Sequence, residues 1–200
     1  MFELVLASHN RGKLVELSAA LAGLPVRLRA AAECGVSEPE EPAVSFVENA
    51  LIKARHAARV SGLPALADDS GLVVDALGGA PGVRSARYAG AGASDVENVV
   101  KLLAATDQLP GSARGCRFVC VLALVNHAQD PLPLIAEGIW EGRLLRVPRG
   151  TGGFGYDPIF ADAQTGLSAA ELSPVQKLAA SHRGKAIVAL KARLLAKLAG

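Results

Sequence analysis

Short apolar runs alternate with amphipathic stretches in the first part of this chain. Residues 3–7 form an apolar run that predicts a strand, and a second strand is predicted near residues 26–29. Between them, Leu14, Leu17 and Leu21 recur at the spacing of one helix face. We therefore predict a strand, a helix and a strand in this order, an alternation typical of α/β proteins.

Two further helices are marked by capping boxes, in which a serine precedes a glutamate by three residues. Ser45 and Glu48 begin a helix that runs to about residue 60, and Ser94 and Glu97 begin another. The positions expected to form the buried side of the second helix are Val96, Val99, Val100 and Leu103.

The second half of the chain predicts a strand pair and a closing helix. Residues 118–125 are continuously apolar, as expected of a strand covered on both faces, and residues 134–140 are its predicted antiparallel partner. Ser181 is the predicted N-cap of the last helix, and His182 and Arg183 sit where they could face a cleft. The apolar side of this helix consists of Ile187, Leu190, Leu194 and Leu198. Together, the patterns predict an α/β fold with a mixed sheet.

Two adjacent carboxylates interrupt the apolar segment at residues 66–74. Asp68 and Asp69, followed by Ser70 and Gly71, stand where we predict that a strand ends, turns and resumes. The same residue types make ordinary turns, because Asp and Ser side chains bond to the local backbone and Gly tolerates positive φ. The segment is therefore either a metal and base site or a turn.

The first strand-to-helix turn has the composition of an anion site. It combines hydroxyl, amide and basic side chains with the backbone amides of a helix N-terminus, which carries partial positive charge. It lacks the Gly-x-x-x-x-Gly-Lys-Ser/Thr spacing, so a P-loop is excluded. The alternative is an N-cap at Asn10 followed by a solvated basic turn. The residues of this turn are Ser8, His9, Asn10, Arg11, Gly12 and Lys13.

An acidic, proline-rich loop spans residues 33–42. Its glutamates Glu38, Glu40 and Glu41 either form a solvated surface or lend a carboxylate to a metal shared with residues 68–69.

The helix after this loop carries Asn49, Lys53 and His56 on one polar face. Such faces usually contact only solvent. Lys53 is singled out because the helix leads directly into the segment that contains Asp68 and Asp69.

A glycine-rich loop at residues 150–155 offers a site for a planar ligand. Glycines allow a backbone to approach a ligand closely, and Phe154 and Tyr156 provide planar surfaces. Asp157 adds a hydrogen-bond acceptor. The alternative is a glycine-rich turn with buried aromatic residues.

Composition limits the classes of function. The 200 residues are 50% hydrophobic, and the length suits one domain, 1–200, or two closely joined lobes. The net charge is +2 with both signs interspersed, so no nucleic-acid partner is expected. The three cysteines form no Cys-x-x-Cys motif, and Cys116 and Cys120 are expected in the core. No apolar run spans a bilayer, so we expect a cytoplasmic protein without a membrane partner.

An anion-binding turn, paired carboxylates and a loop for a planar group are the parts of a nucleotide-phosphate site. Magnesium is the expected metal, because its shell commonly combines one or two carboxylates with phosphate oxygens. No catalytic Ser/His or Cys/His pair is evident, so hydrolysis by metal-activated water is the predicted chemistry.

Six ordered motifs resemble, over essentially the whole chain, the inosine/xanthosine triphosphate pyrophosphatase family. They are Ser8-x-Asn10-x-x-Lys13, Phe46-x-Glu48-Asn49-Ala50-x-x-Lys53-Ala54, Ala67-Asp68-Asp69-Ser70-Gly71-Leu72, Leu77-Gly78-Gly79-Ala80-Pro81-Gly82, Gly152-Gly153-Phe154-Gly155-Tyr156-Asp157-Pro158 and Ser181-His182-Arg183-Gly184.

The resemblance implies a homodimeric, Mg²⁺-dependent enzyme that hydrolyses ITP, dITP and XTP to the monophosphate and pyrophosphate. It implies an elongated sheet flanked by helices, with the active-site cleft between two lobes. By this resemblance, Asp69 binds metal and acts as the base, and Glu40 is the loop carboxylate for the metal. The residues assigned to the substrate are Ser8, His9, Asn10, Arg11, Gly12, Lys13, Lys53, Ser70, Phe154, Gly155, Tyr156, Asp157, Lys177, His182 and Arg183.

Two alternatives remain open from the sequence. One is a related pyrophosphatase for modified pyrimidine or methylated nucleotides, and the other is a nucleotide-binding regulatory module without turnover. The motifs at residues 152–158 and 181–184 favour the purine enzyme, and Asp69 beside a second acidic loop argues against a module without turnover.

Overall fold

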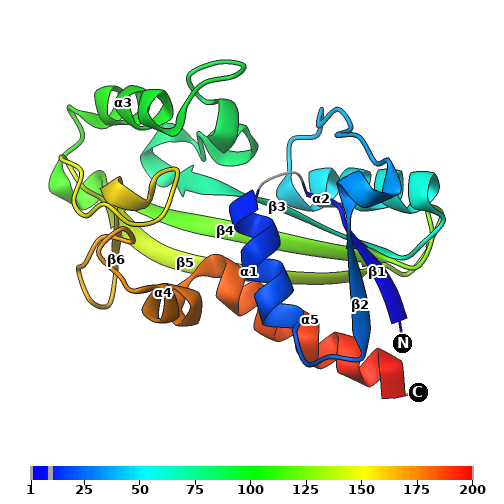
Figure 1. Ribbon diagram of the computed structural model, residues 1–200. Coiled ribbons are helices and arrows are strands. Elements are labelled where there is room, and N and C mark those ends of the chain that lie inside the picture. The colour runs from blue at the N-terminus through cyan, green and yellow to red at the C-terminus, as the bar shows by residue number, and fades with distance from the viewer. Residues whose placement is uncertain (1, 9–10, 200) are drawn as a thin grey trace. The chain divides into compact units, whose positions relative to one another are not determined.

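The computed structural model describes residues 2–8 and 11–199, with Arg11, Lys13, Leu198 and Ala199 described by their backbone alone (Figure 1). The strands are β1 (Phe2–Leu6), β2 (Val26–Ala30), β3 (Ala65–Val74), β4 (Gly115–Val125), β5 (Leu134–Leu144) and β6 (Phe160–Asp162). The helices are α1 (Arg11–Leu21), α2 (Phe46–Ser61), α3 (Asp95–Thr106), α4 (Pro174–Ala180) and α5 (His182–Ala199).

These strands form one mixed sheet in the order β2-β1-β3-β4-β5-β6. β1 is parallel to β2 and to β3, whereas β5 is antiparallel to β6. The predicted α/β fold with a mixed sheet is confirmed.

The chain divides into two compact units. Unit 1 comprises Met1–Asp69, Cys120–Gly138 and Ala186–Gly200, and unit 2 comprises Ser70–Val119 and Ile139–Lys185. The divisions fall inside β3, β4, β5 and α5, so these elements contribute residues to both units.

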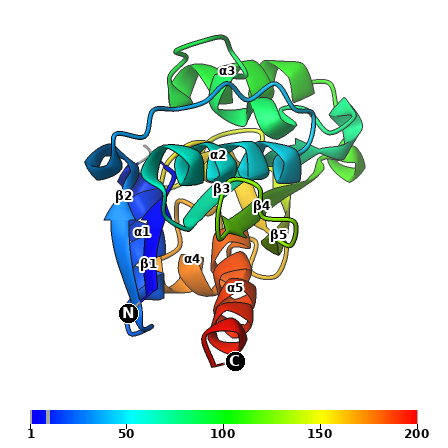
Figure 2. The ribbon, with the colours of Figure 1, turned by 90° about the vertical axis from the view of Figure 1, so that its right-hand side faces the viewer.

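Helices cover both faces of the strands in unit 1. Figure 2 shows α2 on the opposite side of these strands from α5. The buried apolar residues of α2 are Ala50, Ala54, Ala57 and Ala58, and their small side chains allow a close approach to the strands. The larger side chains of the other face are Leu4, Leu6, Leu66, Leu122 and Leu124 from the strands, Leu17 and Leu21 from α1, and Ile187, Leu190 and Leu194 from α5.

Unit 2 is built around a cluster of aromatic rings. Phe118 on β4 and Trp140 on β5 pack against Phe160 of β6, with ring centroids 4.6 and 4.8 Å from that of Phe160. The indole Nε1 of Trp140 donates to a carboxylate oxygen of Asp162 at 2.8 Å, which satisfies the polar atom of this buried ring.

The serines predicted to begin helices do so. Ser45 accepts the backbone N–H of Glu48 at the start of α2, and Ser94 forms the full capping box with Glu97 at the start of α3. Ser181 accepts the N–H of Gly184 at 3.1 Å in the first turn of α5.

All three cysteines carry free thiols, and Cys116 and Cys120 are buried, as predicted. Burial raises the pKa of the Cys116 thiol to about 12, so this thiol stays protonated at neutral pH. Among the helices described, none is long and apolar enough to cross a membrane.

The predicted interruption of a strand at residues 68–71 is wrong, because β3 continues through them. Ser85 Oγ accepts the N–H of Leu72 at 2.8 Å and donates to the carbonyl of Gly82. A Cβ on Gly71 would lie 2.4 Å from Gly82 O and from Ser85 Oγ. Gly71 is therefore needed for the close approach of the 3-10 segment that starts at Gly82, and not for a turn.

The predicted buried side of α3 is partly wrong. Val99 is buried, but Val96 and Val100 are 71% and 61% exposed. Asn98 is buried instead, because its amide makes two hydrogen bonds to the backbone of residues 86–89. Hydrophobic periodicity does not register a polar residue that is buried in this way.

We expect Gly71→Ala to lower the free energy of unfolding by about 1–3 kcal/mol, because the added methyl group must displace backbone and side-chain atoms. Denaturant unfolding followed by the fluorescence of Trp140 measures this change. Gly115→Ala is the matched control, since its Cβ would lie 3.9 Å from the nearest atom, Asp75 Oδ2. Equal stability of the two variants would contradict the close approach at Gly71.

Candidate functional site

A buried ion pair joins α2 and β3 in unit 1. Lys53 Nζ lies 2.9 Å from Asp69 Oδ1, and the two side chains are 13% and 8% exposed. Burial, the largest single influence, lowers the pKa of Lys53, but three neighbouring carboxylates, led by that of Asp69, outweigh it and raise the net pKa. Lys53 therefore carries its positive charge at neutral pH.

The acidic loop reaches the same lysine through Glu41. Glu41 Oε1 lies 3.5 Å from Lys53 Nζ, whereas Glu38 and Glu40 are exposed. Carboxylates from two separate segments thus contact one ammonium group, which marks a position suited to a cation. Among the described side chains, no group of three His, Cys, Asp or Glu could hold a metal. A metal here would complete its shell with water or phosphate oxygens, as Mg²⁺ commonly does.

Asn49 holds the acidic loop beside this ion pair. Its side chain is fully buried, accepts the N–H of Ala43 at 3.2 Å and donates to the carbonyl of Ala43 at 3.4 Å. Its Nδ2 also lies 3.5 Å from Asp69 Oδ2, at the limit of a hydrogen bond. The sequence predicts that the polar face of this helix contacts solvent, and for Asn49 that prediction is wrong.

The first strand-to-helix turn is described in part. Ser8 is half-buried and follows β1, and α1 begins at Arg11, as the predicted turn requires. The predicted site residues His9 and Asn10 lie outside the described residues, as do the side chains of Arg11 and Lys13. The helix start that an anion would use is therefore present in the backbone.

The glycine-rich loop in unit 2 is tied to α4, a short helix that the sequence analysis does not predict. Lys177 Nζ on α4 lies 2.5 Å from Asp157 Oδ2, and the same oxygen accepts the N–H of Phe154 at 2.8 Å. Lys177 Nζ also lies 4.8 Å from the centroid of the Phe154 ring. Because Phe154 is 39% exposed, part of its ring is accessible to a planar ligand.

Tyr156 is buried, in contrast to Phe154. Its hydroxyl donates to the carbonyl of Ser85 at 2.9 Å. Burial, followed by the nearby Tyr88 and Asp95, raises the pKa of the Tyr156 phenol, which therefore stays protonated and remains a donor. Phe154, rather than Tyr156, is the aromatic residue that this loop presents.

His182 and Arg183 begin α5 and are both buried. The imidazole of His182 stacks on Phe118, with centroids 4.8 Å apart and 13° between the planes. Arg183 Nη2 donates to Ser70 Oγ at 3.3 Å, and its guanidinium lies 5.8 Å from the centroid of the Phe154 ring. The structure thus brings Ser70, Arg183 and Phe154 together in unit 2.

Three residues to which the sequence assigns no role contact predicted site residues, two through their side chains and one through its backbone carbonyl. Asn49 contacts Asp69, Ser85 accepts from Tyr156 through its carbonyl, and Asp95 accepts the N–H of Gly155. Asn49 lies four residues before Lys53 on the same helix face, so this spacing could have identified it as a neighbour of the site. Ser85 and Asp95 have no such signal, because their partners are distant in the sequence.

The two units carry different sets of functional groups. Unit 1 presents a lysine for phosphate oxygens and carboxylates for a cation or for proton abstraction from water. Unit 2 presents a partly exposed aromatic ring beside two cationic side chains, a set suited to a planar ring that bears hydrogen-bond acceptors. The chain joins the two sets directly, because Asp69 and Ser70 are consecutive on β3.

Comparison with known sequences shows similarity over nearly the whole chain. The sequence profile of the Ham1 family matches residues 4–193. A dITP/XTP pyrophosphatase of Pseudomonas aeruginosa is 59% identical over 192 residues, with 96% of each chain covered. A dITP/XTP pyrophosphatase of Methylococcus capsulatus is 56% identical over 198 residues, with 99% of this chain and 98% of that chain covered.

Solved structures show the same fold. A HAM1 protein from Coxiella burnetii has a TM-score of 0.93 and 50% sequence identity, and the Staphylococcus aureus Ham1 protein has a TM-score of 0.88 and 36% identity. In both comparisons, 98% of this chain and 99% of the other chain are covered.

We expect Asn49→Ala to lower the free energy of unfolding by about 1–3 kcal/mol, because the backbone groups of Ala43 lose their partner. The acidic loop should then be cleaved faster by a protease specific for glutamate, measured by limited proteolysis and mass spectrometry. Asn98→Ala is the matched control, since Asn98 makes the same two kinds of backbone bond in unit 2. Equally fast cleavage at residues 38–41 in both variants would contradict this role of Asn49.

Proposed function

This chain belongs to the Ham1 family, and we propose that it hydrolyses the non-standard purine nucleoside triphosphates ITP, dITP and XTP to the monophosphate and pyrophosphate. The observation that carries the proposal is the buried Lys53–Asp69 pair on the strand whose next residue, Ser70, contacts Arg183. Near full-length similarity to proteins named dITP/XTP pyrophosphatase supports the same substrate class. Such an enzyme removes deaminated purines from the nucleotide pool.

Asp69 is the proposed general base for the attacking water. Its carboxylate is fixed by Lys53 at 2.9 Å, so it has one orientation toward a bound substrate. Lys53 is the proposed phosphate ligand, because its charge is maintained at neutral pH. Ser8 and the start of α1 would bind further phosphate oxygens.

Phe154, Lys177 and Arg183 are the proposed base-binding residues. Phe154 presents an aromatic face for stacking, and Arg183 offers donors near it. A 6-oxo group accepts such a donor, whereas the 6-amino group of adenine is itself a donor, so adenine would leave buried polar groups unsatisfied.

Magnesium is the proposed cofactor. The donor set fits a hard cation, because the carboxylates of Asp69 and Glu41 contact the same ammonium group. Glu41 is now preferred over Glu40, the ligand that the family resemblance suggests, because Glu40 is exposed. When bound, Mg²⁺ would neutralise phosphate charge and lower the pKa of a coordinated water.

A homodimer in the cytoplasm completes the proposal. The dimer follows from the family resemblance, and the compartment follows from substrates that belong to the free nucleotide pool.

Pyrophosphate release with a panel of nucleoside triphosphates and Mg²⁺ tests the function. We expect kcat/KM for ITP and XTP to exceed that for ATP and GTP by about 100-fold or more. Asp69→Asn should lower kcat by about 10²–10⁴-fold while the variant still folds and binds nucleotide. The control is Asp107→Asn, an exposed carboxylate at the C-terminal end of α3. Equal turnover of ITP and ATP by the wild type would refute the substrate class, and full turnover by Asp69→Asn would exclude it as the base.

The metal ligand is tested by a pair of adjacent variants. We expect Glu41→Gln to raise the Mg²⁺ concentration for half-maximal activity by about tenfold or more, because one oxygen ligand loses its charge. Glu40→Gln should leave that concentration unchanged. The opposite result, an effect at Glu40 and none at Glu41, would restore Glu40 as the ligand.

A further inference from the structure

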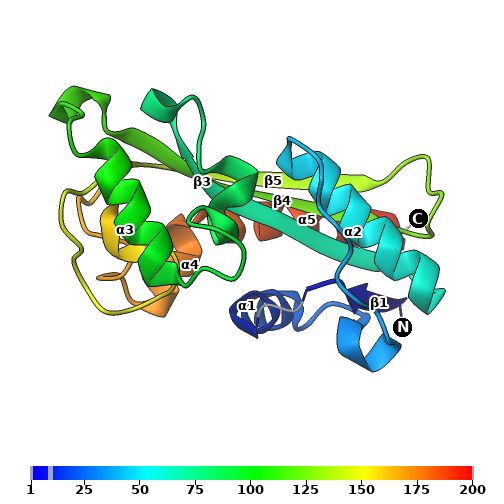
Figure 3. The same ribbon diagram turned by 90° about the horizontal axis from the view of Figure 1, so that it is seen from above.

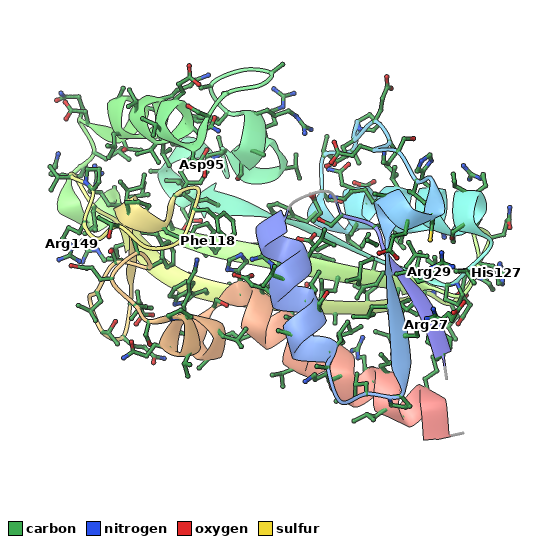
Figure 4. The ribbon with its side chains drawn as sticks, viewed as in Figure 1. Arg27, Arg29, Asp95, Phe118, His127 and Arg149 are labelled. Atoms are coloured by element: carbon green, nitrogen blue, oxygen red, sulfur yellow. The ribbon has the colours of Figure 1, made fainter. Side chains whose placement is uncertain are left out.

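Asp95 connects α3 to the glycine-rich loop in unit 2. It occupies the first position of α3, and its Oδ2 accepts the backbone N–H of Gly155 at 2.7 Å. Figure 3 shows α3 lying over the loop that follows β5, and Asp95 is labelled in Figure 4 at the end of α3 that faces this loop. The bond therefore joins two segments that are sixty residues apart in the chain.

The loop is held at three consecutive residues by three different partners. The N–H of Phe154 is accepted by Asp157, the N–H of Gly155 by Asp95, and the Tyr156 hydroxyl is bonded to the carbonyl of Ser85. Phe154 itself is 39% exposed, so these contacts of the loop contribute to where its ring lies.

The carboxylate of Asp95 is not required for capping its own helix. Ser94 and Glu97 already form the complete capping box, in which each side chain accepts an N–H of the other residue. Gly155, whose N–H bonds to Asp95, has a φ of +60°, a conformation that favours glycine. The Asp95 carboxylate at the start of α3 is therefore available to accept the N–H of Gly155 in the glycine-rich loop.

We propose that Asp95 is a positioning residue for base recognition: it fixes the loop so that the Phe154 ring is presented beside Lys177 and Arg183. This inference rests on the proposed function, because it assigns Phe154 to the nucleobase. Asp95 acts through the loop, because its carboxylate bonds to the backbone of Gly155. Its effect is to order the loop before the substrate binds, so the cost of ordering is not subtracted from affinity.

Kinetics of Asp95 variants test this role with ITP and XTP. We expect Asp95→Ala to raise KM by about five- to tenfold, the size of one lost hydrogen bond, and to change kcat by less than about twofold. Asp95→Asn should show a smaller rise, because its amide oxygen still accepts the Gly155 N–H. Both variants remove the negative charge from the start of α3, so the difference between their KM values reports the loss of the hydrogen-bond acceptor for Gly155 alone. Asp107→Ala, at the other end of α3, is the matched control and should leave KM unchanged.

Hydrogen exchange at the Gly155 amide provides a readout that does not depend on turnover. Exchange should be faster in Asp95→Ala than in the wild type and unchanged in Asp107→Ala. Faster exchange with an unchanged KM would overturn the positioning role, and unchanged exchange would overturn the bond itself. A wild-type enzyme without preference for ITP would instead refute the proposed function, so the two failures are distinguishable.

Discussion

The buried pair of Lys53 and Asp69 is the interaction on which the rest of the structure depends. Removing two charges from water is unfavourable, and a buried pair is tolerated only when its geometry and additional hydrogen bonds compensate. Here α2 supplies Lys53 and also an additional hydrogen bond, because Asn49 lies one helical turn before Lys53 and its Nδ2 lies 3.5 Å from Asp69 Oδ2. The loop that carries Glu41 is drawn to the same lysine. Charged groups held in this way by fixed partners are preorganised, which is the property that electrostatic stabilisation of a charged ligand requires.

The uninterrupted strand β3 links the buried Lys53–Asp69 pair to the residues that follow it in the chain. Because Asp69 and Ser70 are consecutive in an uninterrupted strand, their backbone separation is fixed. Two residues farther on, the N–H of Leu72 bonds to the hydroxyl of Ser85, and the carbonyl of Ser85 accepts from Tyr156. Within unit 2, a displacement of Ser85 would therefore disturb both β3 and the glycine-rich loop that presents the Phe154 ring.

Sequence patterns predicted local structure correctly where the residues that determine it lie close together in the chain. Ser45 and Ser94 were predicted to begin helices because a capping box depends on residues three positions apart. The turn predicted at residues 68–71 failed because the local preference of Asp, Ser and Gly was outweighed by Ser85, thirteen residues beyond Leu72. The ordered motifs suggested the candidate site residues, but the proposal of Glu41 depends on where Lys53 lies, which no local pattern contains.

Each unit uses a buried helical asparagine to hold a neighbouring segment. Asn49 pairs with both backbone groups of Ala43, and Asn98 donates to the carbonyl of Ala86 while it accepts the N–H of Ala89. An amide is suited to this task because it carries a donor and an acceptor in one plane, so a single side chain satisfies both kinds of backbone group. An apolar residue would leave those groups without partners, and a charged one would add a desolvation cost. Irregular segments held in this way are ordered before a ligand arrives, which favours tight and selective binding of a small, highly charged substrate.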